Sequence, residues 1–244
     1  MRRAAGRVPD SAMVLAAGRG TRLRPLTDER PKPLIEIAGN PLIVHALDRL
    51  AAAGVERAVV NLHYKPEMIE AVLAGRARPR IAFSREAELL ETGGGTRQAL
   101  PLLGESFFAL NTDVFWLDGL VPALTRLARA FDPTRMDAIL LMQRAVGAVG
   151  YDGIGDYFLD PLGTPRRRGE REVAPFIFAG IQILHRRLFG EVDERVFSLK
   201  RLYDRAEDAG RLGAIIHEGE WFHIGTPEGL AATRARLASH RIER

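Results

Sequence analysis

Residues 13–34 read MVLAAGRGTRLRPLTDERPKPL. The apolar run Met13–Ala17 is typical of a buried strand, and the glycine-rich turn Gly18–Thr21 follows it directly. A strand that enters such a turn leaves backbone N–H groups in a concave loop, which suits phosphate oxygens. Arg22 and Lys32 add cationic donors beside this loop, and the prolines on either side of Lys32 hold it on a stiff segment. The stretch therefore predicts a polyphosphate-binding site.

The composition is that of an ordinary globular protein. The chain has 244 residues, 46% of them hydrophobic and 27% charged, and it contains no cysteine, which excludes disulfides and thiolate metal sites and is compatible with the cytoplasm. The net charge of +4 comes without a basic cluster interleaved with aromatic residues, so we expect no nucleic-acid partner. The apolar runs are too short to span a bilayer, so we expect no membrane partner either.

The order of predicted elements indicates an α/β fold with a parallel sheet, because helices that alternate with strands act as crossover connections. We expect residues 1–12 to form a mobile N-terminal tail without a signal peptide, and residues 13–244 to form a single domain. The predicted strands are 13–17, 55–62, 80–84, 106–110, 138–142, 157–159, 176–184 and 212–216, and residues 221–227 are predicted to form a last strand and turn. The predicted helices are 41–53, 66–73, 120–131, 198–209 and 227–241.

Several further positions have both a functional and a purely structural interpretation. The segment Glu91–Thr96 contains three glycines before a helical stretch, which allows close approach of a ligand or only a flexible turn. Asp113 follows a buried strand, where it could hold Mg²⁺ or merely cap a turn. Gly180 interrupts a strand as a bulge or a ligand contact. We interpret Arg166–Arg168 as a solvated turn.

Together these residues resemble the sugar-1-phosphate nucleotidylyltransferases. The family signature Leu-Ala-Ala-Gly-x-Gly-Thr-Arg-Leu-x-Pro-Leu-Thr matches Leu15–Thr27, and its Pro-Lys-Pro-Leu matches Pro31–Leu34. The resemblance continues through Gly93-Gly94, Asp113, Phe178–Ile181 and Gly225-Thr226, so it covers nearly the whole chain. It implies a Rossmann-like three-layer sandwich with a mostly parallel central sheet. It also implies transfer of a nucleoside monophosphate from an NTP to a sugar 1-phosphate, which yields an NDP-sugar and pyrophosphate.

The resemblance also implies a role for each matching residue. Arg22 would grip the β and γ phosphates, Lys32 would contact the α-phosphate region, and Asp113 would bind Mg²⁺; these three are the expected catalytic residues. Asn111 and Gly180 would contact the sugar phosphate. No general base is expected, because a sugar phosphate is already ionised near neutral pH. The expected nucleotide-binding residues are Leu15, Ala16, Ala17, Gly18, Gly20, Thr21, Arg22, Lys32, Glu91, Thr92, Gly93, Gly94 and Asn111.

Within the family, two segments resemble one branch most: LETGGGTRQALPLLG at residues 90–104 and Asp113–Trp116. That branch comprises the N-acetylmuramate α-1-phosphate uridylyltransferases of peptidoglycan recycling, which are cytoplasmic. Mannose-1-phosphate guanylyltransferases are the alternative, and a catalytically silent protein that binds nucleotide sugars is the alternative of another class. The resemblance implies an NTP and a sugar 1-phosphate as partners and a monomer or a small homo-oligomer.

The chain departs from the family at His223, where many members carry an aspartate that gives Mg²⁺ a second carboxylate. Imidazole is a poor ligand for Mg²⁺, which prefers oxygen. Four interpretations remain open: Asp113, phosphates and water hold the metal; His223 contacts substrate or favours Mn²⁺; His223 is only structural; or Asp152 or Asp156 replaces the missing aspartate.

Overall fold

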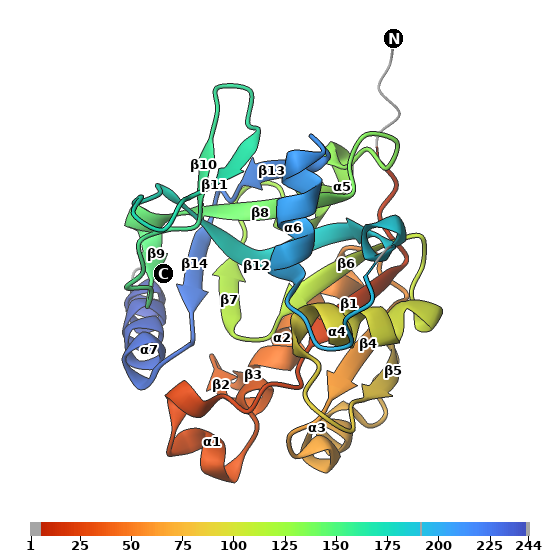
Figure 1. Cartoon of the computed structure of the whole chain (residues 1–244). Helices are drawn as coiled ribbons and strands as arrows, with labels where there is room; N and C mark the ends of the chain where they lie inside the picture. The colour runs from red at the N-terminus through yellow and green to blue at the C-terminus, as the bar shows by residue number, and fades with distance from the viewer. Residues whose placement is uncertain (1–5, 191, 243–244) are drawn as a thin grey trace.

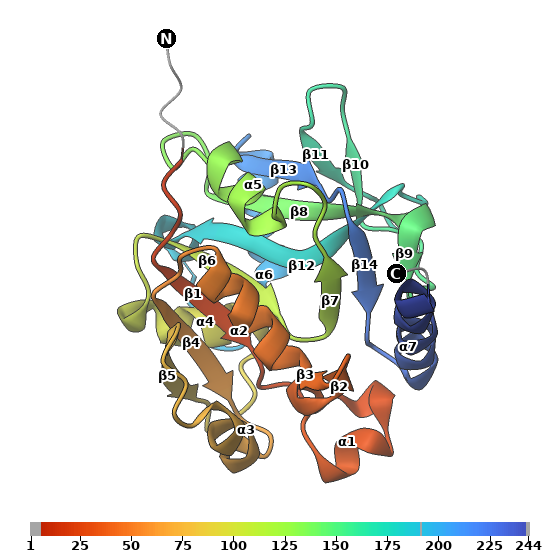
Figure 2. The ribbon, with the colours of Figure 1, turned by 180° about the vertical axis from the view of Figure 1, so that it is seen from behind.

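The computed structural model describes residues 6–190 and 192–242, which form three layers. Helices α4 (Glu91–Ala99) and α6 (Leu199–Asp208) cover one face of the central sheet (Figure 1). Helices α2 (Leu42–Ala52) and α5 (Ala123–Ala130) cover the other face, as the reverse view shows (Figure 2). The remaining helices are α1 (Leu26–Glu29), α3 (Pro66–Leu73) and α7 (Pro227–Ile242). None of the described helices is long and apolar enough to cross a bilayer.

The central sheet is mostly parallel, as predicted. Strands β1, β4, β5, β6, β8 and β13 all point the same way, and β12 runs in the opposite direction between β6 and β8. The strands of this sheet are β1 (Ser11–Leu15), β4 (Arg57–Leu62), β5 (Arg80–Arg85), β6 (Ser106–Asn111), β8 (Ala138–Arg144), β10 (Tyr157–Leu159), β11 (Pro165–Arg167), β12 (Phe176–His185) and β13 (Leu212–Ile216).

Strand β1 lies in the middle of the parallel half, between β4 and β6. Its residues Ala12, Met13 and Val14 are completely buried, with Met13 in the core beneath α4 and α6 and the other two in the core beneath α2 and α5. A parallel strand covered by helices on both faces needs a continuous apolar run, and this is why the sequence of β1 does not alternate. The carboxyl ends of β1, β4 and β6 consequently meet at one edge of the sheet.

A β-bulge interrupts β12. Its pairing with β8 shifts register between Phe178 and Gln182, and Gly180 in the gap has φ of +76°. Glycine adopts this left-handed backbone without the steric cost that a side chain adds. The bulge lies beside Asn111 at the end of β6, because a Cβ on Gly180 would lie 3.1 Å from the Cβ of Asn111.

A second sheet contains β7 (Val114–Leu117), β14 (Glu220–His223) and β9 (Ala148–Val149), with α7 beside it (Figure 1). Strand β7 begins directly after Asp113 and pairs antiparallel with β14, so that Val114 lies opposite His223. The N–H of Ile224 donates to the carbonyl oxygen of Asp113 at 2.8 Å. This pairing brings two residues that are far apart in the sequence to the same edge of the central sheet.

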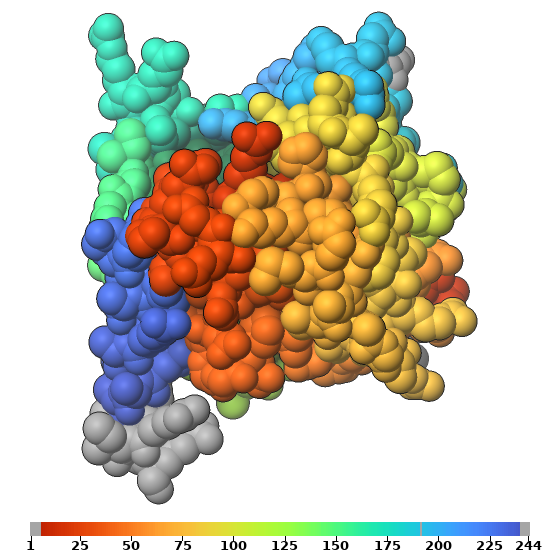
Figure 3. Space-filling model, turned by 90° about the horizontal axis from the view of Figure 1, so that it is seen from below, coloured from red at the N-terminus to blue at the C-terminus, as the bar shows by residue number. Residues whose placement is uncertain are grey.

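The two-stranded hairpin of β2 (Glu36–Ile37) and β3 (Asn40–Pro41) follows the N-terminal loop. In the space-filling view from below (Figure 3), this red and orange N-terminal segment lies between the dark-blue C-terminal helix and the orange-to-yellow segment that includes α3.

Three predictions need correction. Strand β1 begins at Ser11, so Ser11 and Ala12 are buried in the sheet and do not belong to a mobile tail; residues 1–5 lie outside the described residues. The three glycines after Thr92 lie inside α4 and not in a turn before it, because the helix already begins at Glu91. The segment Arg166–Arg168 is not a turn: its first two residues belong to β11, which pairs with β10.

Substitution of a glycine in α4 tests this packing. In Gly93→Ala, the added Cβ would lie 2.3 Å from the ring of Phe197. We expect this overpacking to lower the free energy of unfolding by about 2 kcal/mol even though alanine favours helices, and to lower Tm by roughly 4–8 °C. Thermal unfolding of purified protein measures it. The control is Gly18→Ala, whose Cβ would meet nothing within 4 Å; equal Tm values for the two variants would contradict this account.

Candidate active site

A concave site lies where β1, β4 and β6 end, which is where α/β sheets bind ligands. This first chamber has a volume of about 430 Å³. Most residues expected to bind nucleotide or metal line it: Leu15, Ala16, Ala17, Gly18, Gly20, Thr21, Arg22, Lys32, Glu91, Thr92, Asn111 and Asp113. The sequence analysis missed the other lining residues, which are Pro33, Asn61, Leu89, Thr112, Ser198 and Gly225.

Two hydrogen bonds to one carbonyl group hold the glycine-rich loop after β1 in its conformation. The N–H of Leu23 and the hydroxyl of Thr27 donate to the carbonyl oxygen of Gly20 at 2.9 and 2.8 Å. Gly20 has φ of +62°, and a Cβ there would lie 3.0 Å from the Cβ of Lys32. The absence of a side chain at position 20 therefore lets Lys32 pack directly against the loop.

A buried chain of hydrogen bonds, which the sequence analysis missed, connects the loop to the start of α4. The N–H of Ala16 donates to Oδ1 of Asn61 at 2.7 Å, and Nδ2 of Asn61 donates to Oε1 of Glu86 at 2.7 Å. The second oxygen of Glu86 accepts from the N–H of Leu90 at 2.9 Å, just before α4. One buried carboxylate thus connects the phosphate loop to the opposite wall of the chamber. Asn61 lies near the end of a predicted strand, and this position could have identified it as a site residue. No feature of the sequence identifies Glu86.

Lys32 and Asp113 both line the first chamber and form an ion pair there. The ammonium of Lys32 donates to Oδ2 of Asp113 at 3.0 Å, and their side chains are only 13% and 27% exposed. Burial alone would raise the pKa of Asp113, but the nearby cationic groups, Lys32 first among them, outweigh burial and lower this pKa. Asp113 is therefore ionised at neutral pH and faces the chamber as a negative group beside a positive one.

His223 lies beside Asp113. Its Nε2 is 3.9 Å from Oδ2 of Asp113, its Nδ1 is 3.3 Å from the carbonyl oxygen of Gly150, and its ring is parallel to that of Trp221. Burial lowers the pKa of His223 more than the charge of Asp113 raises it, so the imidazole is neutral at neutral pH. A carbonyl oxygen only accepts, so Nδ1 carries the proton in this tautomer and Nε2 presents a lone pair to Asp113.

The residues present are compatible with a divalent ion. No group of three histidine or carboxylate side chains that could hold a metal gathers in residues 6–190 and 192–242. Asp113 offers one carboxylate at the chamber, and Mg²⁺ is commonly held by one or two carboxylates together with substrate phosphates and water. The donor set therefore fits an ion that arrives with the nucleotide, and Asp113 is the residue that would hold it.

The wall formed by the start of α4 has an unusual backbone. Glu91, which is not a glycine, has φ of +59°, a conformation that costs about 1–3 kcal/mol. The next N–H groups, those of Gly93 and Gly94, both donate to the carbonyl oxygen of Phe197, at 2.8 and 3.1 Å. Neither glycine lines the chamber, so their binding to nucleotide stays a prediction, and their observed role is close packing against the segment before α6.

A second chamber of about 220 Å³ opens beside the first. The two share Thr92, Asn111 and Ser198. The other residues around the second chamber are Asp156, Tyr157, Arg167, Phe178, Leu199, Lys200 and Tyr203. Gly180 lines neither chamber; it packs under the side chain of Asn111, so its contact with a sugar phosphate stays a prediction.

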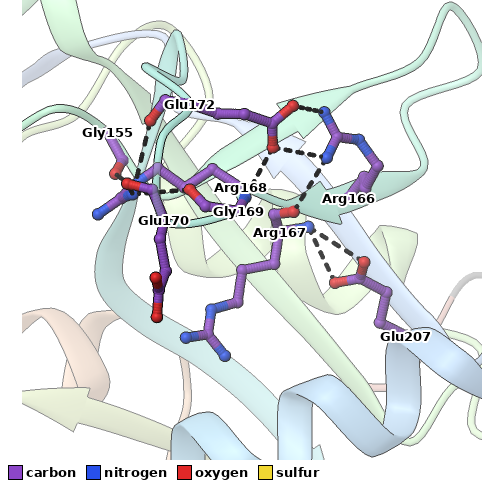
Figure 4. A network of polar contacts seen from close by, with 8 residues as sticks. All are labelled: Gly155, Arg166, Arg167, Arg168, Gly169, Glu170, Glu172 and Glu207. Carbon is purple, nitrogen blue, oxygen red and sulfur yellow. Dashed lines mark hydrogen bonds and ion pairs between the residues drawn. The ribbon is translucent and has the colours of Figure 1, made fainter.

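Ion pairs and hydrogen bonds connect β11 and the residues after it to neighbouring segments (Figure 4). Both oxygens of Glu172 accept from Arg166 at 2.9 Å, and Nε of Arg168 donates to the carbonyl oxygen of Gly155 at 2.8 Å. The backbone N–H of Arg167 donates to the carboxylate of Glu207 on α6, and its guanidinium pairs with Asp204 on the same helix. These contacts hold Arg166 and Arg167 in β11 and Arg168 directly after it, so the three arginines do not form a turn.

Comparisons with known proteins agree with this geometry. Residues 11–144 match the nucleotidyl transferase family. Over 94% of its length, the chain is 44% identical to an N-acetylmuramate alpha-1-phosphate uridylyltransferase of Caulobacter vibrioides, of which it covers 98%. Over 88% of its length, it is 29% identical to a probable mannose-1-phosphate guanylyltransferase 2 of Arabidopsis thaliana, of which it covers 62%.

A solved structure has a similar fold. An inositol-1-phosphate CTP transferase from T. maritima superposes with a TM-score of 0.78 at 20% identity, with 96% of each chain covered. The chain therefore belongs to the nucleotidyl transferase family, among the sugar-1-phosphate nucleotidyltransferases.

The backbone of Glu91 yields a prediction with two readouts. In Glu91→Gly, the left-handed conformation no longer costs energy, so we expect the free energy of unfolding to rise by about 0.5–1 kcal/mol. We also expect affinity for the nucleoside triphosphate to fall about tenfold because the chamber loses a polar group. Chemical denaturation and titration calorimetry measure the two effects.

The control is Ala38→Gly, an exposed residue with φ of +49° outside both chambers, which should show the gain in stability alone. Unchanged nucleotide affinity in Glu91→Gly would remove Glu91 from the nucleotide site.

Proposed function

We propose that this protein transfers UMP from UTP to N-acetylmuramate 1-phosphate, releasing pyrophosphate and forming UDP-N-acetylmuramate. The reaction serves peptidoglycan recycling in the cytoplasm, the compartment that contains UTP. The choice of substrates is supported by the full-length match to the Caulobacter vibrioides uridylyltransferase, which has higher identity and closer length than the guanylyltransferase of Arabidopsis thaliana.

One observation carries the reaction type: Lys32 and Asp113 lie 3.0 Å apart in the first chamber, close to Asn111, which both chambers share. The first chamber has the phosphate loop and the second is lined by polar side chains and aromatic rings, as a sugar site would be. UTP in the first chamber and the sugar in the second would bring the acceptor phosphate to the α-phosphorus near Lys32.

The reaction requires positioning more than acid–base chemistry. An oxygen of the sugar phosphate attacks the α-phosphorus in line, the bond from that phosphorus to the bridging oxygen breaks, and pyrophosphate leaves with the bonding electrons. Arg22 and the loop at Gly18–Thr21 would hold the β and γ phosphates, and Lys32 would stabilise charge on the α-phosphate. A divalent ion beside Asp113 would further offset the repulsion between the two anions. The attacking oxygen is already ionised, so no residue needs to remove a proton.

A matrix of NTPs against sugar 1-phosphates, with pyrophosphate release as the readout and Mg²⁺ or Mn²⁺ present, tests this function. We expect the highest kcat/KM for UTP with N-acetylmuramate 1-phosphate. Turnover only with GTP and mannose 1-phosphate would replace the proposed substrates. Nucleotide binding without turnover of any pair would favour a silent nucleotide-sugar-binding protein.

Two arginines of the N-terminal loop form a matched pair for testing the phosphate site. Arg22 lines the first chamber, whereas Arg24 does not and pairs with Asp28 at 3.0 Å on the exposed surface. We expect Arg22→Ala to lower kcat/KM about 100-fold or more, because it removes a donor to the leaving phosphates. Arg24→Ala should retain nearly full activity. Steady-state kinetics measures both, and comparable losses would mean that the loop binds the triphosphate differently.

A further inference from the structure

We propose that His223 is a nitrogen ligand that makes the metal site of this protein prefer Mn²⁺ to Mg²⁺. The proposal rests on the proposed function in one respect, a divalent ion beside Asp113, and it goes further by naming the second ligand and the ion. Two features of the structure support it: the position of Nε2 and the contact that fixes the tautomer.

The backbone fixes the position of the ring. Strand β14 pairs with β7, and the Ile224 N–H donates to the carbonyl oxygen of Asp113, so the residue before Ile224 is held beside Asp113. The ring stays where it is because Gly225 leaves room for it: a Cβ at Gly225 would lie 2.3 Å from Cε1 of His223. The result is an imidazole nitrogen and a carboxylate oxygen 3.9 Å apart, close enough for both to bind one ion after a small adjustment.

The contact with Gly150 fixes the tautomer. Nδ1 of His223 is 3.3 Å from the carbonyl oxygen of Gly150, so the proton lies on Nδ1 and the lone pair lies on Nε2. Metal-binding histidines commonly donate their other ring N–H to a backbone carbonyl or a carboxylate in this way. Gly150 itself is restricted to glycine here, because a Cβ would lie 2.5 Å from the carbonyl oxygen of His223.

Substrate contact by His223 and replacement of the missing carboxylate by Asp152 or Asp156 fit the structure less well. His223 is not among the residues that line either chamber, which disfavours direct contact with a substrate, but its Nε2 lies 3.9 Å from Asp113, which lines the first. Of the aspartates that could have replaced the missing carboxylate, Asp156 lines the second chamber and accepts from the Phe178 N–H at 3.0 Å, and Asp152 is exposed.

The choice of ion follows from the donor atoms. Mg²⁺ demands oxygen ligands, whereas Mn²⁺ accepts carboxylate, phosphate and imidazole donors. Oδ2 of Asp113, which is 3.9 Å from Nε2, also accepts from Lys32 at 3.0 Å, and a carboxylate oxygen has lone pairs for both an ion and this donor. A site made of one carboxylate oxygen and one imidazole nitrogen therefore favours Mn²⁺ over Mg²⁺.

Metal binding to the full-length protein tests the proposal without reference to turnover. The probe is Mn²⁺ with α,β-methylene UTP, which has no bridging nitrogen, in competition with Mg²⁺. Electron spin echo modulation of bound Mn²⁺ should show ¹⁴N coupling in the wild type, none in His223→Asp, and unchanged coupling in His185→Gln, a histidine at the far end of β12. His223→Asp should also lower the ratio of Mn²⁺ to Mg²⁺ affinity at least tenfold.

Absence of ¹⁴N coupling in the wild type, or an unchanged affinity ratio in His223→Asp, would overturn the proposal. If His223→Asp does not fold, His223→Gln replaces it, and the wild-type spectrum alone still decides whether nitrogen binds the ion. The substrate matrix reports on the proposed function separately: a wild type that turns over UTP but shows no ¹⁴N coupling would retain that function and lose this inference.

Discussion

The contact between Lys32 and Asp113 connects the two parts on which the site depends. Lys32 belongs to the N-terminal loop that follows β1, and Asp113 belongs to the junction between the central sheet and the smaller sheet. A lysine held without an anion in a partly buried chamber would lose hydration with no compensation. The carboxylate offsets that cost before substrate arrives, so the ammonium is already in place when a phosphate enters. Preorganised charge of this kind needs little rearrangement during the reaction.

Much of the fold was predictable because local patterns and packing agree. Strand β1 is continuous and apolar because both of its faces are covered, and α3 has the predicted bounds Pro66–Leu73, with proline at its first position. The phosphate loop was predictable from its signature, and the structure brings Arg22, Lys32 and Asp113 to one chamber as expected.

The remaining parts depend on contacts between distant segments, which local patterns do not contain. The glycines of α4 look like a ligand loop in the sequence, yet the N–H groups and missing side chains of Gly93 and Gly94 accommodate the segment at Phe197. Glu86 carries no motif, and only the folded chain shows that its carboxylate connects Asn61 to the start of α4. Similarly, Arg166–Arg168 resemble a solvated turn until their partners on neighbouring segments are known.

The two chambers are built from different parts of the chain. Most of the first is formed by residues between Leu15 and Asp113, inside the segment 11–144 that matches the family, whereas most of the second is formed by residues between Asp156 and Tyr203. Only a few side chains, Asn111 among them, serve both. With the acceptor assigned to the second chamber as proposed, substitutions in the later segment would alter which acceptor is used and leave the first chamber intact. Such a division would let one ancestral phosphate loop diversify across many sugars.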